Sequence, residues 1–381
     1  MCAEWSPPRS ACGASPPGGR RQWPGKAGST ASAWLRVARR KQRGLSMVEL
    51  MVGIVVSMLV GLAATTSAVM FTAAQRQGFG AGGSSINAAT VLGAIKNDAA
   101  QAGLGFFGES LSLCTTLNFS NDTAAVSDGA AFAPMQATRD GDHDVLNVLY
   151  ASIVESGTNV LTAKPSDTTS VELRSLMPAV VGSAVLLAPE DTGGRCTVRT
   201  VTAVTDASAV VPWQILTFGA AGVHNKAAFA SASNYPSRSR ASLLGAVRWN
   251  RYRVSAGNLV LERPIDGTSA VLARNVIAFR VQYGIAATAT GTTLDSWVDA
   301  SGTYATLTTA NIDFVRAARI ALLVRSPQRE KPDAAGNCTA TDTAPLVFGA
   351  APGAFTGPST DWRCFRHRVS TVVVPLRNFV F

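Results

Sequence analysis

The chain has 381 residues, of which 47% are apolar and only 15% are charged, a composition that excludes an intrinsically disordered chain and predicts a packed core. Its formal net charge of +10 would suit nucleic acid or anionic lipid if it were spread over the folded surface. However, nine Lys or Arg and a single acid lie in residues 1–44, which leaves a net charge of only +2 for residues 45–381. We therefore expect no direct nucleic-acid partner.

The first strong pattern after this basic segment is a stretch long enough to cross a membrane. Residues 50–74 contain no charge, and a helix rising about 1.5 Å per residue would carry them across the roughly 30 Å hydrocarbon layer. Because basic residues precede this stretch, we expect a single pass through a bacterial inner membrane, with a cytoplasmic N-terminus and a periplasmic C-terminal domain. Glu49 lies at the start of the apolar run, where an acid costs on the order of 3 kcal/mol and marks a functional position.

The sequence around Glu49 resembles the processing site of type IV prepilins. The basic run at 39–43 ends in Gly44, and Leu45, Ser46, Met47, Val48 and Glu49 follow. The resemblance implies cleavage by a prepilin peptidase after Gly44 and N-methylation at Leu45, which replaces the commoner Phe. It also implies that Glu49 pairs with the free amino terminus of a neighbouring subunit, because two charges in apolar surroundings are tolerated only as a pair. The alternative is that Glu49 simply turns toward the cytoplasmic interface.

The length of the leader is unusual for this family, in which most leaders are short. Residues 1–36 are a mixture of Pro, Gly, Ser, Arg and Trp without periodicity. We interpret residues 1–36 as a mis-called start, with translation beginning at Val37.

Several later segments resemble the PilW family of minor pilins. They are residues 99–103, 142–146, 276–283, 315–326 and 368–378. With the processing site, the resemblance covers most of the chain from Arg40, and it describes residues 109–135 and 327–360 least. It implies an α+β, pilin-like fold: a long N-terminal helix in residues 45–108, membrane-spanning in its first half, packed on a β-rich, mostly antiparallel periplasmic domain in residues 109–381.

The residue pattern is consistent with this fold. Ile86, Ala89, Leu92 and Ile95 lie on one helical stripe, and the glycines of residues 78–83 predict a kink before it. The GxGxxG letters of residues 103–108 follow a helix rather than a strand, so we interpret them as a helix stop and not as a dinucleotide site. The predicted strands are residues 145–153, 184–188, 196–204, 211–218, 246–254, 259–262, 276–283, 317–325 and 368–374.

Four cysteines lie beyond the leader, at Cys114, Cys196, Cys338 and Cys364. Their even number and wide spacing favour disulfides over a zinc site and allow three connectivities. We favour Cys338 with Cys364, because the intervening Gly, Pro and Ala-rich segment would gain most from a cross-link, which leaves Cys114 with Cys196. Four free buried thiols are the alternative.

The strongest candidate for a metal-binding or catalytic site is the cluster Asp140, Asp142, His143 and Asp144, whose carboxylate oxygens would suit calcium. The cluster lacks the rest of a calcium loop and lies at a strand entry, where Asp is commonly a turn residue. We therefore expect no metal, no cofactor and no catalytic residue.

The expected function is that of a minor pilin, a structural subunit that helps to initiate or cap type IV pilus assembly and so supports twitching motility and adhesion. Its expected partners are the prepilin peptidase and, through the N-terminal helix, other minor pilins and the major pilin. The large mature chain favours a low-copy role. The alternatives are a J-like pseudopilin of a type II secretion system and a membrane-anchored periplasmic binding protein or enzyme.

Overall fold

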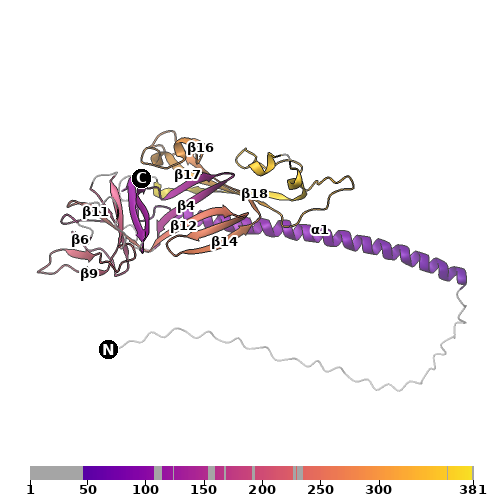
Figure 1. Ribbon diagram of the computed structural model, residues 1–381, viewed down its shortest axis with the longest axis horizontal. Coiled ribbons are helices and arrows are strands. Elements are labelled where there is room, and N and C mark those ends of the chain that lie inside the picture. Colours follow the sequence, from indigo (N-terminus) through magenta and orange to yellow (C-terminus); the bar gives the residue numbers. More distant parts are fainter. Residues whose placement is uncertain are drawn as a thin grey trace, which may run out of the picture. The chain divides into compact units, whose positions relative to one another are not determined.

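The computed structural model describes residues 46–379 except 107–113, 123, 153–158, 167–168, 191–193, 226–228, 230–234 and 358. The side chains of residues 69–86, 124–125, 159 and 379 also lie outside the description. Within the described residues, one long helix is followed by a series of strands and short 3-10 helices (Figure 1). By its contacts the chain divides into two units, residues 1–66 and residues 67–381.

Helix α1 spans Met47–Gln101, 55 residues. It continues through residues 78–83, so the predicted kink is not found there. Its C-terminal part buries one face, formed by Ala88, Val91, Leu92, Ile95 and Ala99. The predicted stripe is correct for Leu92 and Ile95 but wrong for Ala89, which is exposed, because the buried face is rotated toward Ala88 and Val91.

Eighteen strands follow in four sheets within the described residues.

 Of the fourteen pairings between neighbouring strands, thirteen are antiparallel, and the pairing of β1 with β8 is parallel. This arrangement is the α+β fold expected from the sequence.

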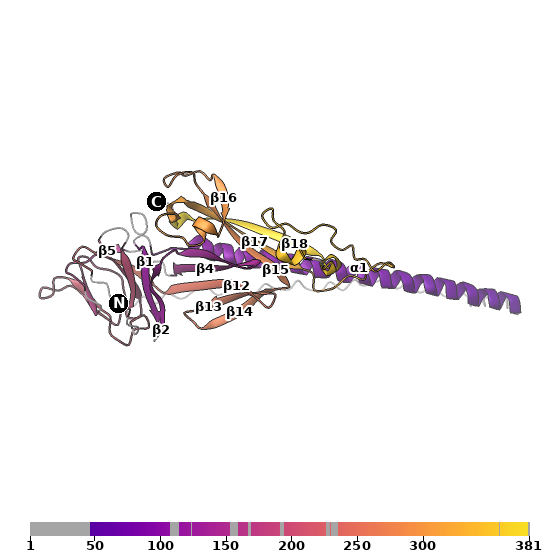
Figure 2. The ribbon, with the colours of Figure 1, turned by 45° about the horizontal axis from the view of Figure 1, so that its top comes forward.

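Two sheets lie beside the C-terminal part of α1 (Figure 2). The five-stranded sheet has the order β14 (Thr268–Arg274), β13 (Asn258–Arg263), β12 (Val247–Ser255), β4 (His143–Ala151) and β3 (Met135–Asp140). The four-stranded sheet has the order β16 (Ser296–Asp299), β15 (Val276–Ile285), β17 (Val315–Arg325) and β18 (His367–Pro375). Apolar side chains of both sheets and of α1 form one core cluster, which holds the helix against the sheets.

Two further sheets lie beyond the C-terminal end of α1. The six-stranded sheet has the order β2 (Ala124–Ala131), β1 (Thr116–Asn121), β8 (Arg195–Thr200), β7 (Ala184–Ala188), β11 (Arg240–Gly245) and β5 (Asn159–Leu161). The three-stranded sheet has the order β6 (Ser170–Leu173), β10 (Gln214–Thr217) and β9 (Ala203–Thr205). Strand β7 is buried on both faces, because Leu186 belongs to one core cluster and Leu187 to another.

The turn between α1 and the strands contains the GxGxxG letters. Gly103 and Gly105 have positive φ, at 82° and 83°, immediately after the helix ends. Such φ values favour glycine and are typical of a helix stop. The interpretation of these residues as a stop is therefore confirmed, and Phe106 follows them into the core.

All nine predicted strand segments overlap strands of the structure, but the predicted strand 196–204 is divided between β8 and β9, which belong to different sheets. The structure adds β1, β2, β3, β5, β6, β11, β14 and β16, which the sequence analysis did not predict. Five 3-10 helices complete the described elements: η1 (Gly302–Tyr304), η2 (Ile312–Phe314), η3 (Gly353–Phe355), η4 (Asp361–Cys364) and η5 (Arg377–Phe379).

Candidate functional site

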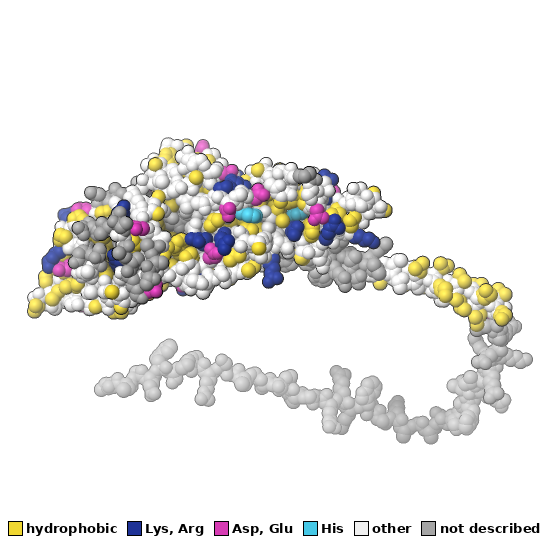
Figure 3. All heavy atoms as spheres, viewed as in Figure 1, with side chains coloured by type: hydrophobic (Ala, Val, Ile, Leu, Met, Phe, Trp, Pro, Cys, Tyr) yellow, Lys and Arg dark blue, Asp and Glu magenta, His cyan; other side chains and the backbone are white. Residues whose placement is uncertain are grey.

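The start of α1 is apolar and uncovered. Residues Met47–Ala68 form a 22-residue stretch with the length and composition of a membrane span, and none of it is buried in the protein. Met47, Leu59 and Leu62, for example, expose more than half of their surface. Figure 3 shows the apolar side chains gathered on this part of the helix. A soluble protein rarely exposes an apolar surface of this extent, so it requires lipid or protein around it.

Glu49 is the one acid in this stretch and lies in the first turn of α1. It is exposed, like the apolar residues around it. A carboxylate in the first turn interacts favourably with the positive end of the helix dipole. Gly44 and Leu45, the predicted processing residues, lie outside the described residues.

At the other end of α1, Asp98 joins the helix to the five-stranded sheet. Its carboxylate accepts hydrogen bonds from Tyr150 Oη at 3.1 Å, from Asn250 Nδ2 at 2.5 Å and from Tyr252 Oη. Burial, followed by the nearby Asp98 charge, raises the pKa of Tyr150 to about 12 and also raises the pKa of Tyr252. Both phenols are therefore neutral donors at physiological pH. The sequence analysis missed this contact, since the partners of Asp98 lie some 50 to 150 residues away in sequence.

Replacing Asp98 with alanine should lower the free energy of unfolding by about 3 kcal/mol, because three donors would lose a charged acceptor. Gln101→Ala is the matched control, since Gln101 is exposed and its amide, among the described residues, donates to the Asn97 carbonyl of its own helix. The control should change stability by less than about 0.5 kcal/mol. Urea denaturation of the detergent-solubilised chain measures both. Equal stability of the two variants would mean that Asp98 does not hold the helix to the sheet.

A second buried carboxylate, Asp144, joins the five-stranded and four-stranded sheets. It is completely buried on β4 and accepts a hydrogen bond from the Val281 backbone N–H at 2.7 Å. Arg139 Nε lies 3.2 Å and Arg280 Nε 3.3 Å from its oxygens, close enough for ion pairing. Burial raises the pKa of Asp144, whereas the Val281 N–H and the two guanidinium groups lower it.

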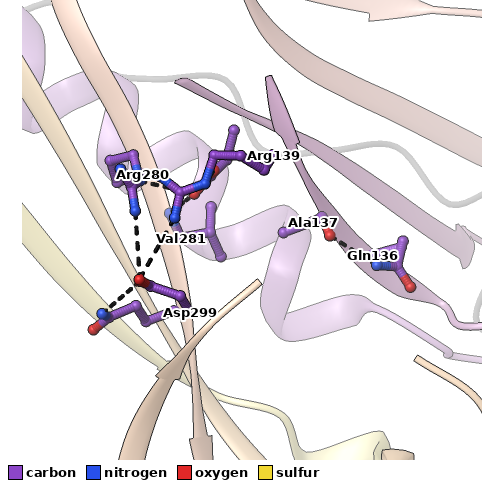
Figure 4. A network of polar contacts seen from close by, with 8 residues as sticks. Gln136, Ala137, Arg139, Arg280, Val281 and Asp299 are labelled. Carbon is purple, nitrogen blue, oxygen red and sulfur yellow. Dashed lines mark hydrogen bonds and ion pairs between the residues drawn. The ribbon is translucent and has the colours of Figure 1, made fainter. Parts of the chain in front are cut away.

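The two arginines also reach Asp299 on β16, each with an N···O distance of 3.5 Å (Figure 4). Gln282 Nε2 donates to Asp299 at 2.7 Å, and Arg319 Nε donates to Gln282 at 2.6 Å. The network therefore runs from β3 and β4 across β15 to β16 and β17. Each charge in the network faces an opposite charge or an amide, so the network connects the two sheets structurally.

The four residues considered as calcium ligands do not converge. Asp144 points into this network, while the Asp142 carboxylate accepts a hydrogen bond at 2.9 Å from the N–H of Gly353, the first residue of η3. Asp140 is exposed at the end of β3. In the described part of the chain, no group of three or more His, Cys, Asp or Glu side chains is placed to hold a metal.

The four cysteines form two disulfides, Cys114–Cys196 and Cys338–Cys364, with Cα–Cα distances of 5.4 and 4.7 Å. These are the two pairs favoured from the sequence. The first joins the segment just before β1 to β8, and the second closes a segment that covers the outer face of the four-stranded sheet. There Val347 and Phe355 pack on Ala321 and Leu323 of β17.

Comparison with known proteins gives matches at both ends of the chain. The model of the prokaryotic N-terminal methylation motif matches residues 39–65, which include Gly44, Leu45 and Glu49. The model of type IV pilus-assembly protein W, PilW, matches residues 252–378, from β12 to η5. Among solved structures, a type IV-like pilin from Thermus thermophilus is 11% identical, covers 78% of this chain and 98% of its own, and has a TM-score of 0.32. No significant match was found among curated proteins.

An apolar helix that begins in an N-terminal methylation motif and leads into a mostly antiparallel β-rich domain defines a membrane-anchored, pilin-like subunit. The matches over residues 39–65 and 252–378 together support a PilW-type minor pilin with a role in type IV pilus assembly. Such a subunit interacts with other pilins and with the pilus machinery, which indicates a structural role.

Proposed function

We propose that this minor pilin enters the pilus through α1 and helps to initiate or cap its assembly, without catalytic activity of its own. A prepilin peptidase cleaves after Gly44, and Leu45 becomes the new, methylated N-terminus. The subunit then leaves the lipid by packing α1 against the helices of other minor pilins and of the major pilin. Twitching motility and adhesion depend on the resulting filament.

The observation that carries this proposal is the uncovered apolar start of α1 with a single carboxylate, Glu49, in its first turn. An anchor alone has no need of this acid, which costs on the order of 3 kcal/mol in lipid. In a bundle of pilin helices, Glu49 would lie opposite the amino group of a neighbouring subunit's Leu45, and the two charges would neutralise each other.

The proposed orientation places the N-terminus in the cytoplasm and the β-rich unit in the periplasm. The basic residues before the helix favour this direction under the positive-inside rule. Two disulfides in the β-rich unit also suit an oxidising compartment. The subunit is therefore a single-pass inner-membrane protein before assembly and part of the pilus afterwards.

A low-copy position at the start or tip of the filament suits a subunit of this size. A major pilin must repeat closely along the filament, whereas this chain adds a second group of sheets beyond the end of α1. A type II secretion pseudopilin would use the same helix in another machine. The PilW match favours the pilus over that alternative.

Replacing Glu49 with alanine tests the proposal. We expect the variant to insert in the membrane at normal levels but to enter pili at least about tenfold less, since loss of the pair removes more than about 1.4 kcal/mol of assembly free energy. Quantitative immunoblotting of sheared pili, relative to the membrane fraction, measures this ratio.

The matched control exchanges two neighbouring residues, Val48→Glu with Glu49→Val. Composition and hydropathy remain the same, but the carboxylate moves by one position and turns about 100° around the helix. This variant should fail to assemble like Glu49→Ala. Wild-type incorporation of either variant would contradict the pairing of Glu49 with a neighbouring amino terminus.

A further inference from the structure

Strand β18 forms one edge of the four-stranded sheet and pairs on one side only. Nine consecutive residues, His367–Pro375, face β17 without a register shift. In Figure 2, β18 lies beside β17 at the border of the sheet. No strand of the described chain pairs with its other edge.

The backbone groups on that free edge can be assigned from the hydrogen bonds at the two ends of the strand. Ser326 N–H donates to Arg366 C=O at 2.7 Å, and Leu376 N–H donates to Arg316 C=O at 2.9 Å. Since the bonding direction alternates along an antiparallel strand, the even-numbered residues of β18 bond to β17. The N–H and C=O groups of His367, Val369, Thr371 and Val373 therefore point outward.

The disulfide-closed segment covers the start of this edge, where Thr341 Oγ1 also lies 3.3 Å from His367 Nδ1. The Phe365 C=O, next in the outward series, accepts a hydrogen bond from Thr341 Oγ1 at 2.6 Å, within the disulfide-closed segment. From His367 onward, the outward backbone groups of β18 have no hydrogen-bond partner among the described residues. These unpaired backbone groups can form hydrogen bonds with one more strand.

Other long edges of the described sheets are protected. Register shifts interrupt β2 and the pairing of β14 with β13, and such bulges hinder strand addition. On β3, the Ala137 N–H donates to Tyr283 Oη at 2.6 Å. By contrast, β18 is regular, and residues 369–374 read Val-Ser-Thr-Val-Val-Val without a charge. Exposed β-branched sequences of this kind readily pair with another strand.

Charge at the two ends of β18 indicates the partner. Arg368 and Arg377 are exposed, and neither forms an ion pair within the described residues. No acid occurs from residue 367 to residue 379. A second copy of β18 would bring two more arginines and no acid to the edge. An extended segment with an uncharged, β-branched centre and acidic ends would complement it.

We propose that β18 binds such a segment from another pilin subunit by strand addition to the four-stranded sheet. The outward N–H and C=O groups of His367 to Val373 form the ladder, and Arg368 and Arg377 pair with acids at the ends of the added strand. This interface rests on the proposed function, in that it needs a neighbouring pilin, but it lies in the β-rich unit and does not involve Glu49.

A photo-crosslinking residue at Thr371 of the full-length protein, in cells that assemble the pilus, tests the interface directly. The matched control is the same residue at Val271, which is 53% exposed on the edge strand β14. We expect a crosslink from position 371, but not from 271, to an extended acidic-ended segment of a protein that carries a prepilin-type N-terminus, identified by mass spectrometry. No adduct, an adduct to a non-pilin, or an adduct to another copy of this chain would overturn the proposal.

Proline substitutions test the role of the backbone. Thr371→Pro removes an outward N–H and no bond to β17, so we expect unchanged unfolding but at least a tenfold loss of the crosslink formed from position 373. Ser370→Pro removes a bond to β17 and should instead lower the unfolding temperature.

If Thr371→Pro proves unstable, Arg368→Glu provides the second test, with the same tenfold loss of the crosslink expected. A fully retained crosslink in a folded variant would exclude strand addition, while Glu49→Ala separately tests entry into the pilus.

Discussion

Replacing Cys114 and Cys196 together with alanine is expected to lower the free energy of unfolding by about 4.5 kcal/mol. The two cysteines are 82 residues apart, and the cross-link removes most of the loop-closure entropy of that segment from the unfolded chain. Both side chains are buried, at 1% and 0% exposure, so alanine keeps the site apolar. Urea denaturation under oxidising conditions measures the change.

The second disulfide supplies the comparison for this result. Cys338 and Cys364 are only 26 residues apart, and their replacement by alanine should cost about 3.5 kcal/mol. A reducing agent should bring the wild type down to the stability of the variant that lacks all four cysteines. The expectation fails if the loss at 114 and 196 is smaller than the loss at 338 and 364.

Replacing Asp144 with alanine is expected to lower the free energy of unfolding by about 3–5 kcal/mol, because removal of one partner leaves buried charge without compensation. Arg280 exposes only 17% of its side chain, and the Val281 N–H would lose its acceptor. The two sheets that meet at Asp144 would then be joined by apolar packing, by the partly exposed Arg139–Asp299 pair and by the hydrogen bond from the Ala137 N–H to Tyr283 Oη. Tryptophan fluorescence in urea follows the transition.

Asp299→Ala is the matched control for Asp144. Asp299 contacts the same two arginines at 3.5 Å, but 41% of its side chain is exposed. Solvent screens such pairs, so the expected loss is below about 1 kcal/mol. Similar losses of unfolding free energy in the two variants would show that the burial of Asp144 does not decide how much its contacts contribute to stability.

The strands that the sequence analysis found differ in character from those that it missed. Strands β15 and β17 are long and rich in Val, Ile and Leu, so their pattern is visible without tertiary information. By contrast, β1 and β2 read TLNFSN and AAVSDGAA, with Asn, Asp, Ser and Gly that local rules assign to turns. Pairing with β8 and burial of Leu117 and Phe119 override those preferences.

The sequence by itself determined the features that depend on the order of residues along the chain. A basic leader, Gly44, Leu45, Glu49 and an uncharged apolar run are adjacent, so they indicate a pilin and its membrane anchor without any fold. The tertiary structure alone decided which polar residues matter in the β-rich unit. In the sequence, Asp98 looks like an ordinary polar position and Asp144 like a turn residue, and only long-range packing surrounds them with tyrosine, asparagine and arginine donors. The free edge of β18 has the same origin, because a strand becomes an edge only through the position of its neighbours in the sheet.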